Sequence, residues 1–304
     1  MELTMPLIFE PIAGPTGLSK QKAYLSRLSM CGQRTSDYSF LNLWGWSEEH
    51  DLSWAWEDDL VWIRQNSPSL CYWAPIGPWR EIDWSGRFAQ HVSGGARFIR
   101  IPELLSETLK DAFGETLQIS ESRGHWDYLY NVKDMVELKG NRFHKKKNMV
   151  NQFKKNYSFS LVPLGPEFAR EALALQEDWC LWRDCESIEA LAAENRVIKK
   201  IFANWHAFEN LMGAGIVIDS RLVAYTVAEP LEEQVVLIHF EKANTDFKGV
   251  YQAINQTFLE SVQDRFGTVN REQDLDDAGL RKAKLSYQPV GFQKKFEVIY
   301  NGTA

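Results

Sequence analysis

A phenol and two cations follow one another at helical spacing near the C-terminal end of the sequence. Arg281 and Lys284 are three residues apart in the segment AGLRKAKLSYQP, and so are Lys284 and Tyr287. Residues at this spacing share a helix face, so the three side chains can line one groove. A tyrosine with a pKa of about 10 is protonated at neutral pH and can donate a proton. The segment indicates a general acid beside an anion site, with an ordinary amphipathic helix as the alternative.

A carboxylate and an imidazole lie on one face of a predicted strand. His239 and Glu241 alternate in QVVLIHFEKA, so their side chains emerge on the same side. A carboxylate in this position could accept a proton from an amine or hydroxyl nucleophile. The alternative for Glu241 is an ion pair with Lys242 or a nearby arginine, and for His239 it is a hydrogen-bonded core histidine.

Three more charged residues lie in the predicted strand TVNREQD, just before the last predicted helix. They belong either to the same site or to a structural salt-bridge network, and both interpretations stay open. The three residues are Arg271, Glu272 and Asp274.

Two segments have the residues of an anion site. In NTDFKGVY, a strand is followed by a turn with Lys248 and Gly249 and then by a helix, whose free N–H groups suit a phosphate or carboxylate. Residues 139–155 contain seven Lys or Arg and no Asp or Glu, with Lys145, Lys146 and Lys147 in succession. This basic segment could bind a polyanion such as tRNA. The alternatives are a simple strand-to-helix connection and a solvated helix that links two domains.

The composition argues against several classes of protein. The 304 residues carry a net charge of -7, which does not suit a general coat for nucleic acid or anionic membrane. No stretch is apolar enough for a membrane span and the first residues lack a secretion-signal pattern, so we expect a cytoplasmic protein. The four cysteines have neither metal-site nor disulfide spacing. We therefore expect reduced, buried thiols, no metal and no tightly bound cofactor.

The elements that must position these residues occur in the same order twice. This order predicts two mixed α/β domains, over residues 1–155 and 156–304. The second half has the pattern of a strand, two helices, three strands, a helix, a strand, a helix and a strand, with the segments around Val217, Val223 and Ile238 adjacent in one sheet. This is the element order of an acetyltransferase (GNAT) domain.

Tryptophan is concentrated in the first half of the sequence. Eight of the twelve tryptophans lie between Trp44 and Trp84, and four of these eight are in the predicted strand segments LSWAWEDDLVWIRQ and LCYWAPIG. Half-buried strands favour aromatic residues, so we expect most of these side chains to pack in a core. An aromatic platform for a substrate is the alternative.

Three segments carry a resemblance to a known family, and the likeness covers nearly the whole chain. They are YLYNVKDMVELKGNRFHKKKNMVNQF, HFEKANTDFKGVYQAINQTF and VNREQDLDDAGLRKAKLSYQP. The chain resembles uncharacterised bacterial proteins that are similar to the C-terminal catalytic domain of phosphatidylglycerol lysyltransferase. That domain has a G-L-R-x-x-K-x-x-aromatic-x-P helix, matched here by Gly279, Leu280, Arg281, Lys284, Tyr287 and Pro289. The resemblance implies two GNAT-like domains in tandem and a donor that is aminoacyl-tRNA or acyl-coenzyme A.

The resemblance to GNAT domains also implies a role for one tyrosine. In such domains a tyrosine of the last helix protonates the leaving group, and the run AKLSYQPVGF places Tyr287 in that role. The coenzyme A loop of GNAT domains, Arg/Gln-x-x-Gly-x-Gly/Ala, is not kept, because Asp246 and Tyr251 stand at its first and last positions. A carboxylate facing a pyrophosphate is unfavourable, which weakens the case for coenzyme A.

Together these observations predict an acyl- or aminoacyltransferase that uses direct transfer. Glu241 positions or deprotonates an acceptor amine or hydroxyl, on a small molecule or a lipid headgroup, and Tyr287 protonates the leaving oxygen or sulfur. The residues expected to hold the donor phosphates are Lys145, Lys146, Lys147, Lys248, Gly249, Arg281 and Lys284. The alternatives are an acetyl-coenzyme A-dependent N-acetyltransferase and a non-catalytic binder of RNA or an anionic metabolite.

Overall fold

The computed structural model describes residues 6–302, which form two compact units. The first unit contains the residues up to Asp127 and those from Gln293 onward, and the second contains Tyr128–Phe292. The boundary expected after residue 155 is therefore corrected. The basic helix α7 (His144–Asn156) is no linker, because it packs on helix α10 (Val250–Val262) within the second unit.

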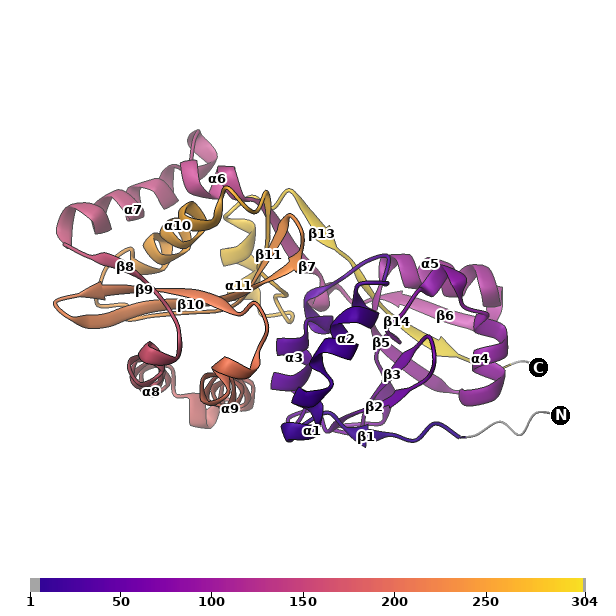
Figure 1. The fold of residues 1–304 in the computed structure, drawn as a ribbon. Helices are drawn as coiled ribbons and strands as arrows, with labels where there is room; N and C mark the ends of the chain where they lie inside the picture. Colours follow the sequence, from indigo (N-terminus) through magenta and orange to yellow (C-terminus); the bar gives the residue numbers. More distant parts are fainter. Residues whose placement is uncertain (1–5, 303–304) are drawn as a thin grey trace. The chain divides into compact units, whose positions relative to one another are not determined.

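The first unit is built around a seven-stranded mixed sheet with the order β1-β2-β3-β4-β5-β14-β6. Its strands are β1 (Glu10–Pro11), β2 (Leu52–Trp56), β3 (Val61–Gln65), β4 (Cys71–Tyr72), β5 (Ala96–Pro102), β6 (Leu117–Glu121) and β14 (Lys295–Tyr300). Its helices are α1 (Gly14–Ser19), α2 (Gln21–Leu28), α3 (Phe40–Gly45), α4 (Trp84–His91) and α5 (Glu103–Phe113). Strand β14 lies between β5 and β6 and is antiparallel to both (Figure 1).

Tryptophans fill the core of this unit. Trp54 on β2 and Trp62 on β3 are fully buried, and Trp44, Trp73 and Trp79 are 2% exposed. Large aromatic side chains bury much apolar area and prefer tilted or edge-to-face contacts, such as the one between Tyr38 and Trp73. The core-packing interpretation of the tryptophan-rich segment is confirmed for these residues.

A buried ionic cluster holds the start of β14. Lys295 is fully buried and pairs with the carboxylates of Asp37 and Asp127, at 2.6 Å from Asp127 Oδ1. Asp127 also accepts hydrogen bonds from the Ser36 backbone N–H (2.8 Å) and hydroxyl (2.7 Å). Burial alone would raise the pKa of Asp37, but the charges of Lys295 and Arg100 outweigh it and lower the pKa. Removing one partner would leave an uncompensated buried charge, so the cluster fixes β14 in place.

The second unit is also built around a seven-stranded mixed sheet, with the order β13-β7-β12-β11-β10-β9-β8. Its strands are β7 (Asp127–Asn131), β8 (Ser160–Pro163), β9 (Met212–Ile218), β10 (Arg221–Glu232), β11 (Val235–Ala243), β12 (Thr268–Asn270) and β13 (Gly291–Gln293). Besides α7 and α10, its helices are α6 (Val132–Glu137), α8 (Ala169–Arg183), α9 (Glu189–Ala203) and α11 (Ala278–Leu285).

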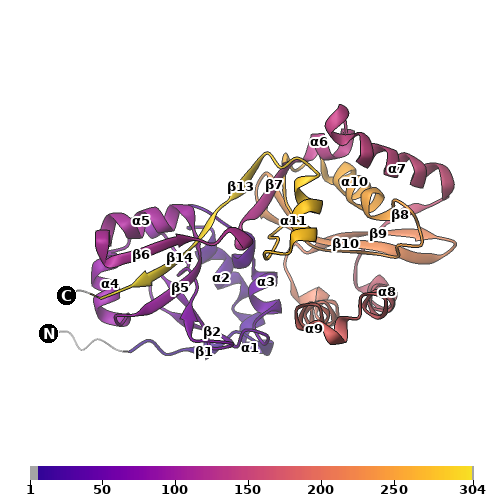
Figure 2. The same ribbon diagram turned by 180° about the vertical axis from the view of Figure 1, so that it is seen from behind.

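The predicted neighbours in this sheet are found. Strands β9, β10 and β11 are consecutive and antiparallel, and β12 runs parallel to β11. Asp219 and Ser220 both have positive φ angles (48° and 62°), as the tightest hairpin turns require. Helices α8 and α9 cover one face of the sheet, whereas α7 and α10 lie on the other (Figures 1 and 2).

The last predicted strand, FQKKFEVIY, is divided in the structure. Its first residues belong to β13, which lies beside β7 in the second sheet, and the rest form β14 in the first sheet. The chain thus passes from one unit to the other within a segment whose apolar pattern predicts one continuous strand.

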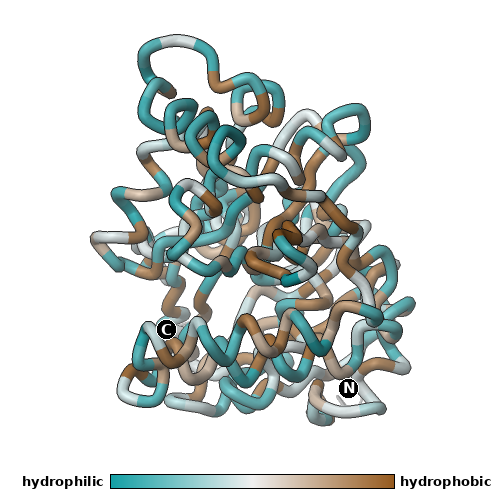
Figure 3. The backbone as a smooth tube through the Cα atoms, turned by 90° about the vertical axis from the view of Figure 1, so that its left-hand side faces the viewer, coloured by the Kyte–Doolittle hydropathy of each residue, from teal (hydrophilic) through white to brown (hydrophobic). Residues whose placement is uncertain are grey.

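Apolar stretches in the described chain are short. Brown and teal segments alternate along the tube in Figure 3, as expected where helices and strands each bury one face. Within residues 6–302, no helix combines the length and the apolar character needed to cross a bilayer.

The prediction for the cysteines is half wrong. Cys31 and Cys71 are buried free thiols as expected, but Cys180 and Cys185 form a disulfide. Asp184 takes a left-handed conformation after α8 and turns the chain back, which brings the two Cα atoms to 5.0 Å. This separation lies within the usual range for disulfides.

Candidate active site

The second unit has a groove of about 360 Å³ beside helix α7. One wall comes from α7 and the turn before it, and the other from α10 and the residues after α11. The lining residues are Asn141, Arg142, Lys145, Lys146, Met149, Gln252, Ser286 and Gln288. A second hollow of about 280 Å³ shares Met149 and Gln252 with the groove and extends along the N-terminal end of α10. The two hollows adjoin each other and bring four basic side chains to one surface, Arg142, Lys145, Lys146 and Lys248.

The structure divides the predicted anion-binding residues between these hollows. Lys145 and Lys146 line the groove, and Lys248 and Gly249 line the second hollow. Lys147 is exposed and lines neither of them. The basic segment therefore presents only part of its charge to the site.

The packing of α10 against α7 explains why a glycine stands at position 249. Its φ angle is +90°, and a Cβ atom there would lie 2.4 Å from the carbonyl oxygen of Met149 on α7. Only glycine allows this conformation and this close approach of two helices. The glycine is thus required by the packing of α10 against α7, whether or not a ligand binds.

Tyr287 adjoins the groove without lining it, because its chain neighbours Ser286 and Gln288 and its contacts Lys146 and Gln252 are lining residues. It follows α11, is 8% exposed, and has the ammonium of Lys146 4.1 Å from its ring centroid. Its hydroxyl is hydrogen-bonded to the side chains of Gln252 and Arg271. Burial raises the pKa of Tyr287 to about 12, although the charge of Arg271 opposes this shift. The phenol therefore keeps its proton at neutral pH and can act as a donor.

A buried ion pair supports Tyr287 from below. Arg271 pairs with Glu241 Oε2, and Asn255 Nδ2 donates to Glu241 Oε1 at 2.9 Å. Burial alone would lower the pKa of Arg271, but the charge of Glu241 outweighs it and raises the pKa, so the guanidinium stays charged. The alternative interpretation of Glu241 as an ion-pair partner thus has its arginine, whereas Lys242 pairs with Glu194 at 2.6 Å.

Arg271 begins a loop with unusual backbone angles. Glu272, Leu275 and Asp276 all have positive φ angles, between 50° and 60°. Such angles are costly for residues other than glycine and persist only where the surroundings enforce them. Enforced strain of this kind is common at functional sites.

Asp274 is the centre of this loop. It is fully buried and accepts hydrogen bonds from the Tyr128 hydroxyl (2.6 Å) and twice from Arg281 (both 2.8 Å). Burial alone would raise the pKa of Asp274, but these hydrogen bonds outweigh it and lower the pKa to about 2. Arg281 also pairs with Asp276, so its charge is engaged within the loop.

Lys284 also has a partner inside the unit. Its ammonium donates to the backbone carbonyl of Arg271, and Tyr130 donates to the carbonyl of Lys284 at 2.9 Å. Neither Arg281 nor Lys284 lines the groove, although both were expected to hold donor phosphates. Their place at the base of the strained loop indicates that they support Arg271.

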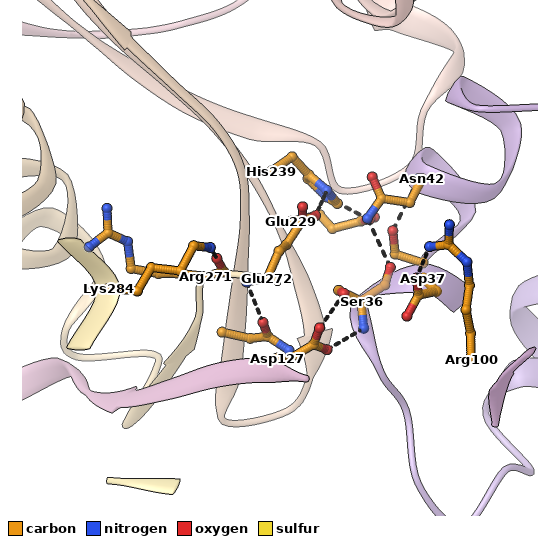
Figure 4. Close-up of polar contacts among 12 residues, drawn as sticks. Ser36, Asp37, Asn42, Arg100, Asp127, Glu229, His239, Arg271, Glu272 and Lys284 are labelled. Atoms are coloured by element: carbon orange, nitrogen blue, oxygen red, sulfur yellow. Dashed lines mark hydrogen bonds and ion pairs between the residues drawn. The ribbon is translucent and has the colours of Figure 1, made fainter. Parts of the chain in front are cut away.

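His239 connects strand β11 to the same loop. Figure 4 shows its ring between Glu229 and Glu272, with both ring nitrogens 3.0 Å from a carboxylate oxygen. Burial alone would lower the pKa of His239, but the two carboxylates outweigh it and raise the pKa to about 9. His239 is therefore an imidazolium that donates from both nitrogens, in agreement with the hydrogen-bonded core alternative.

This histidine predicts a pH dependence of stability. Its folded pKa lies above the unfolded value of about 6.5, so its stabilising contribution is complete below pH 6.5 and is lost as the pH rises through about 9. We expect the Tm of His239→Gln to be lower than that of the wild type at pH 6 and to fall less between pH 7 and pH 10. Circular dichroism melts across this range test it, with the exposed His206→Gln as control. Equal slopes for His239→Gln and the wild type would contradict the assignment.

Sequence reasoning missed the residues that complete the site. Gln252 and Asn255 lie three apart on α10, and their polar side chains interrupt an otherwise apolar helix face. That interruption is a usable signal, because a buried amide needs a hydrogen-bond partner. Tyr128 and Tyr130 alternate on β7 and carry no such signal, because aromatic residues are common in strands.

Comparison with known proteins gives a family and a fold. The family model described as phosphatidylglycerol lysyltransferase, C-terminal, matches residues 29–299. An uncharacterised protein from Mycoplasmoides gallisepticum is 24% identical over 177 residues, which are 57% of this chain and 55% of that protein. The match thus spans about half the length of that relative.

Three solved structures are similar over almost the whole chain. A conserved protein of unknown function from Bacteroides thetaiotaomicron is 28% identical with a TM-score of 0.84, covering 97% of this chain and 99% of that one. The C-terminal domain of a protein described as a candidate lysylphosphatidylglycerol synthetase from Agrobacterium fabrum is 12% identical with a TM-score of 0.64, covering 94% and 93%. FemX is 8% identical with a TM-score of 0.56, covering 94% and 96%. The predicted architecture of two GNAT-like α/β domains in tandem is confirmed.

Proposed function

The chain belongs to the family of phosphatidylglycerol lysyltransferase C-terminal domains, and from this premise we propose that it is an acyltransferase that uses an aminoacyl ester as its donor. The acceptor is an amine or a hydroxyl on a lipid headgroup or small molecule. The observation that carries the proposal is the contact of the enclosed Tyr287 phenol with Lys146, one of the basic residues that line the groove. A transfer reaction needs a proton donor for its leaving group, and a buried phenol meets that need.

Tyr287 and Arg271 act together on the leaving group, the first as proton donor and the second by stabilising the phenolate. When the ester bond breaks, Tyr287 gives its proton to the departing oxygen and becomes a phenolate. Arg271, which is hydrogen-bonded to the same hydroxyl, stabilises that negative charge. Glu241 holds the guanidinium in place through their buried ion pair. This arrangement gives Glu241 a positioning role, in place of the contact with the acceptor expected from the sequence.

Lys145 and Arg142 are the groove residues proposed to bind the phosphates of the donor. Lys145 is exposed, and the ion-pair partner of Arg142 is the partly exposed Asp134. Both cations can therefore contact a phosphate with little loss of existing interactions. The single-stranded end of an aminoacyl-tRNA carries successive phosphates and a terminal ester. Such a polyanion fits a groove whose cations lie on one wall and whose proton donor adjoins it. We therefore propose aminoacyl-tRNA as the donor.

A transfer assay tests the proposed function. The full chain is incubated with tRNA charged with a mixture of ¹⁴C-labelled amino acids, together with phosphatidylglycerol vesicles or soluble amines, and the acceptor fraction is counted. We expect label to move only when charged tRNA is supplied, and a parallel reaction with ¹⁴C-acetyl-coenzyme A to give none. Transfer from acetyl-coenzyme A alone would instead identify an N-acetyltransferase. The absence of transfer from both donors would overturn the proposal and leave a binding protein.

A further inference from the structure

Lys146 differs from the other enclosed lysines of this chain. Lys242 pairs with Glu194, and Lys295 pairs with two aspartates. Lys146 is half-buried against the Tyr287 ring, yet within residues 6–302 it has no hydrogen bond or ion pair to a carboxylate. A half-buried amine without a counter-charge is expensive as an ammonium, and less so as a neutral amine.

The charged surroundings of Lys146 favour the neutral form. From the loop after β12 it faces Arg271, whose partner Glu241 lies beyond the guanidinium, and from the residues after α11 it faces the uncharged Tyr287. Its own element and the turn before it contribute the cations Lys145 and Arg142, and α10 contributes the uncharged Gln252. Burial, aided by Arg271, lowers the pKa of Lys146 to about 8.

The other bases near the site are already engaged. Both carboxylate oxygens of Glu241 accept hydrogen bonds, one from Asn255 and one from Arg271. Both ring nitrogens of His239 donate to carboxylates, so the imidazolium has no free lone pair. Lys146 lines the groove itself, where an acceptor would meet the donor ester. A lysine desolvated in this way is a known type of general base.

We propose that the neutral amine of Lys146 accepts the proton of the acceptor nucleophile, an inference that rests on the proposed function. The acceptor nitrogen or oxygen forms a bond to the ester carbonyl carbon, and its proton passes to Lys146 Nζ. The bond between that carbon and the donor oxygen then breaks, and the oxygen takes the proton of Tyr287. The Lys146 ammonium restores the Tyr287 proton through solvent, so no proton is gained or lost.

Two substitutions separate a base from a simple cation. Lys146→Arg keeps the positive charge but cannot lose it near neutral pH, and Lys146→Gln removes both charge and base. We expect both variants to lose transfer by about 100-fold or more, and to lose the rise in kcat/KM that the wild type shows with an apparent pKa near 8. The exposed Lys110→Gln on α5, outside the basic segment and the groove, should behave like the wild type. Near-normal transfer by Lys146→Arg, with loss in Lys146→Gln, would overturn the proposal in favour of an electrostatic role.

A second measurement does not depend on turnover. Trace acetylation of the full chain with acetic anhydride between pH 6 and pH 11, followed by peptide mass spectrometry, reports the titration of each lysine. We expect a midpoint near 8 for Lys146, well below the value of about 10.4 for an unperturbed lysine side chain. An ordinary midpoint for Lys146 would overturn the base assignment even if transfer is observed. A midpoint near 8 with no transfer from any donor would count against the proposed function instead.

Discussion

Replacing Tyr287 with phenylalanine is expected to lower aminoacyl transfer by about 10²–10⁴-fold, the usual contribution of a positioned general acid. The substitution keeps the ring that Lys146 and Arg271 contact and removes only the hydroxyl that is hydrogen-bonded to Gln252 and Arg271. Losing that hydroxyl costs about 1 kcal/mol of folding free energy, so the protein stays folded. The measurement is single-turnover transfer from charged tRNA at neutral pH, together with a thermal melt.

The control for this experiment is Tyr157→Phe. Tyr157 is a half-buried tyrosine of the same unit, and its hydroxyl has no hydrogen bond within the described residues. Tyr157→Phe should keep normal transfer. Full turnover by Tyr287→Phe would remove the phenol from the mechanism, and a Tyr287→Phe protein that fails to fold would favour a structural role for this residue.

Breaking the largely buried pair between Arg271 and Glu241 should lower the stability of the protein strongly. In Arg271→Met, the Glu241 carboxyl group loses its counter-ion in a site where its side chain is only 9% exposed. We expect the free energy of unfolding to fall by about 3–5 kcal/mol, the usual cost of an uncompensated buried charge. Urea unfolding of the purified chain measures this change.

A double mutant shows whether the cost comes from the unpaired charge. Arg271→Met combined with Glu241→Gln removes both charges and should recover part of the lost stability. The matched control is Lys199→Met, which breaks an exposed pair with Glu177 and should cost less than about 1 kcal/mol. If Arg271→Met costs no more than Lys199→Met, then solvent reaches the Arg271 site and the buried-pair description is wrong.

The fold of the second unit could be predicted because its signals are local. The strands β9, β10 and β11 have β-branched runs and a polar turn at Asp219–Ser220, and helices α8 to α10 have apolar residues at helical spacing. Tyr287 and Lys146 were both identified as site residues from local motifs. Their contact, however, joins residues far apart in the sequence, and no spacing rule could place one above the other.

The predictions that the structure corrects concern residues whose partners lie elsewhere in the sequence, so no local pattern indicates them. In the sequence, Lys295 resembles an exposed lysine on a strand, yet it is buried and forms ion pairs with the carboxylates of Asp37 and Asp127. Arg281 and Lys284 do share a helix face. However, Arg281 donates its hydrogen bond to Asp274, and Lys284 donates to the Arg271 carbonyl, so neither is directed to a ligand. The Cys180–Cys185 disulfide depends on the left-handed Asp184, which few residue types adopt and which the sequence did not indicate. The unit boundary was misplaced because a charge-rich helix resembles a linker until its packing partner is known.

The position of β14 has a consequence for synthesis on the ribosome. Translation proceeds from the N-terminus, so β14 emerges only after every element of the second unit. Until then β6 has no strand beside it and β5 presents an unpaired edge, since β14 is the neighbour of both. An open edge of this kind invites pairing with other chains. The unit that is started first is therefore finished last, and during elongation its half-built sheet is the part of the nascent chain that most needs protection from aggregation.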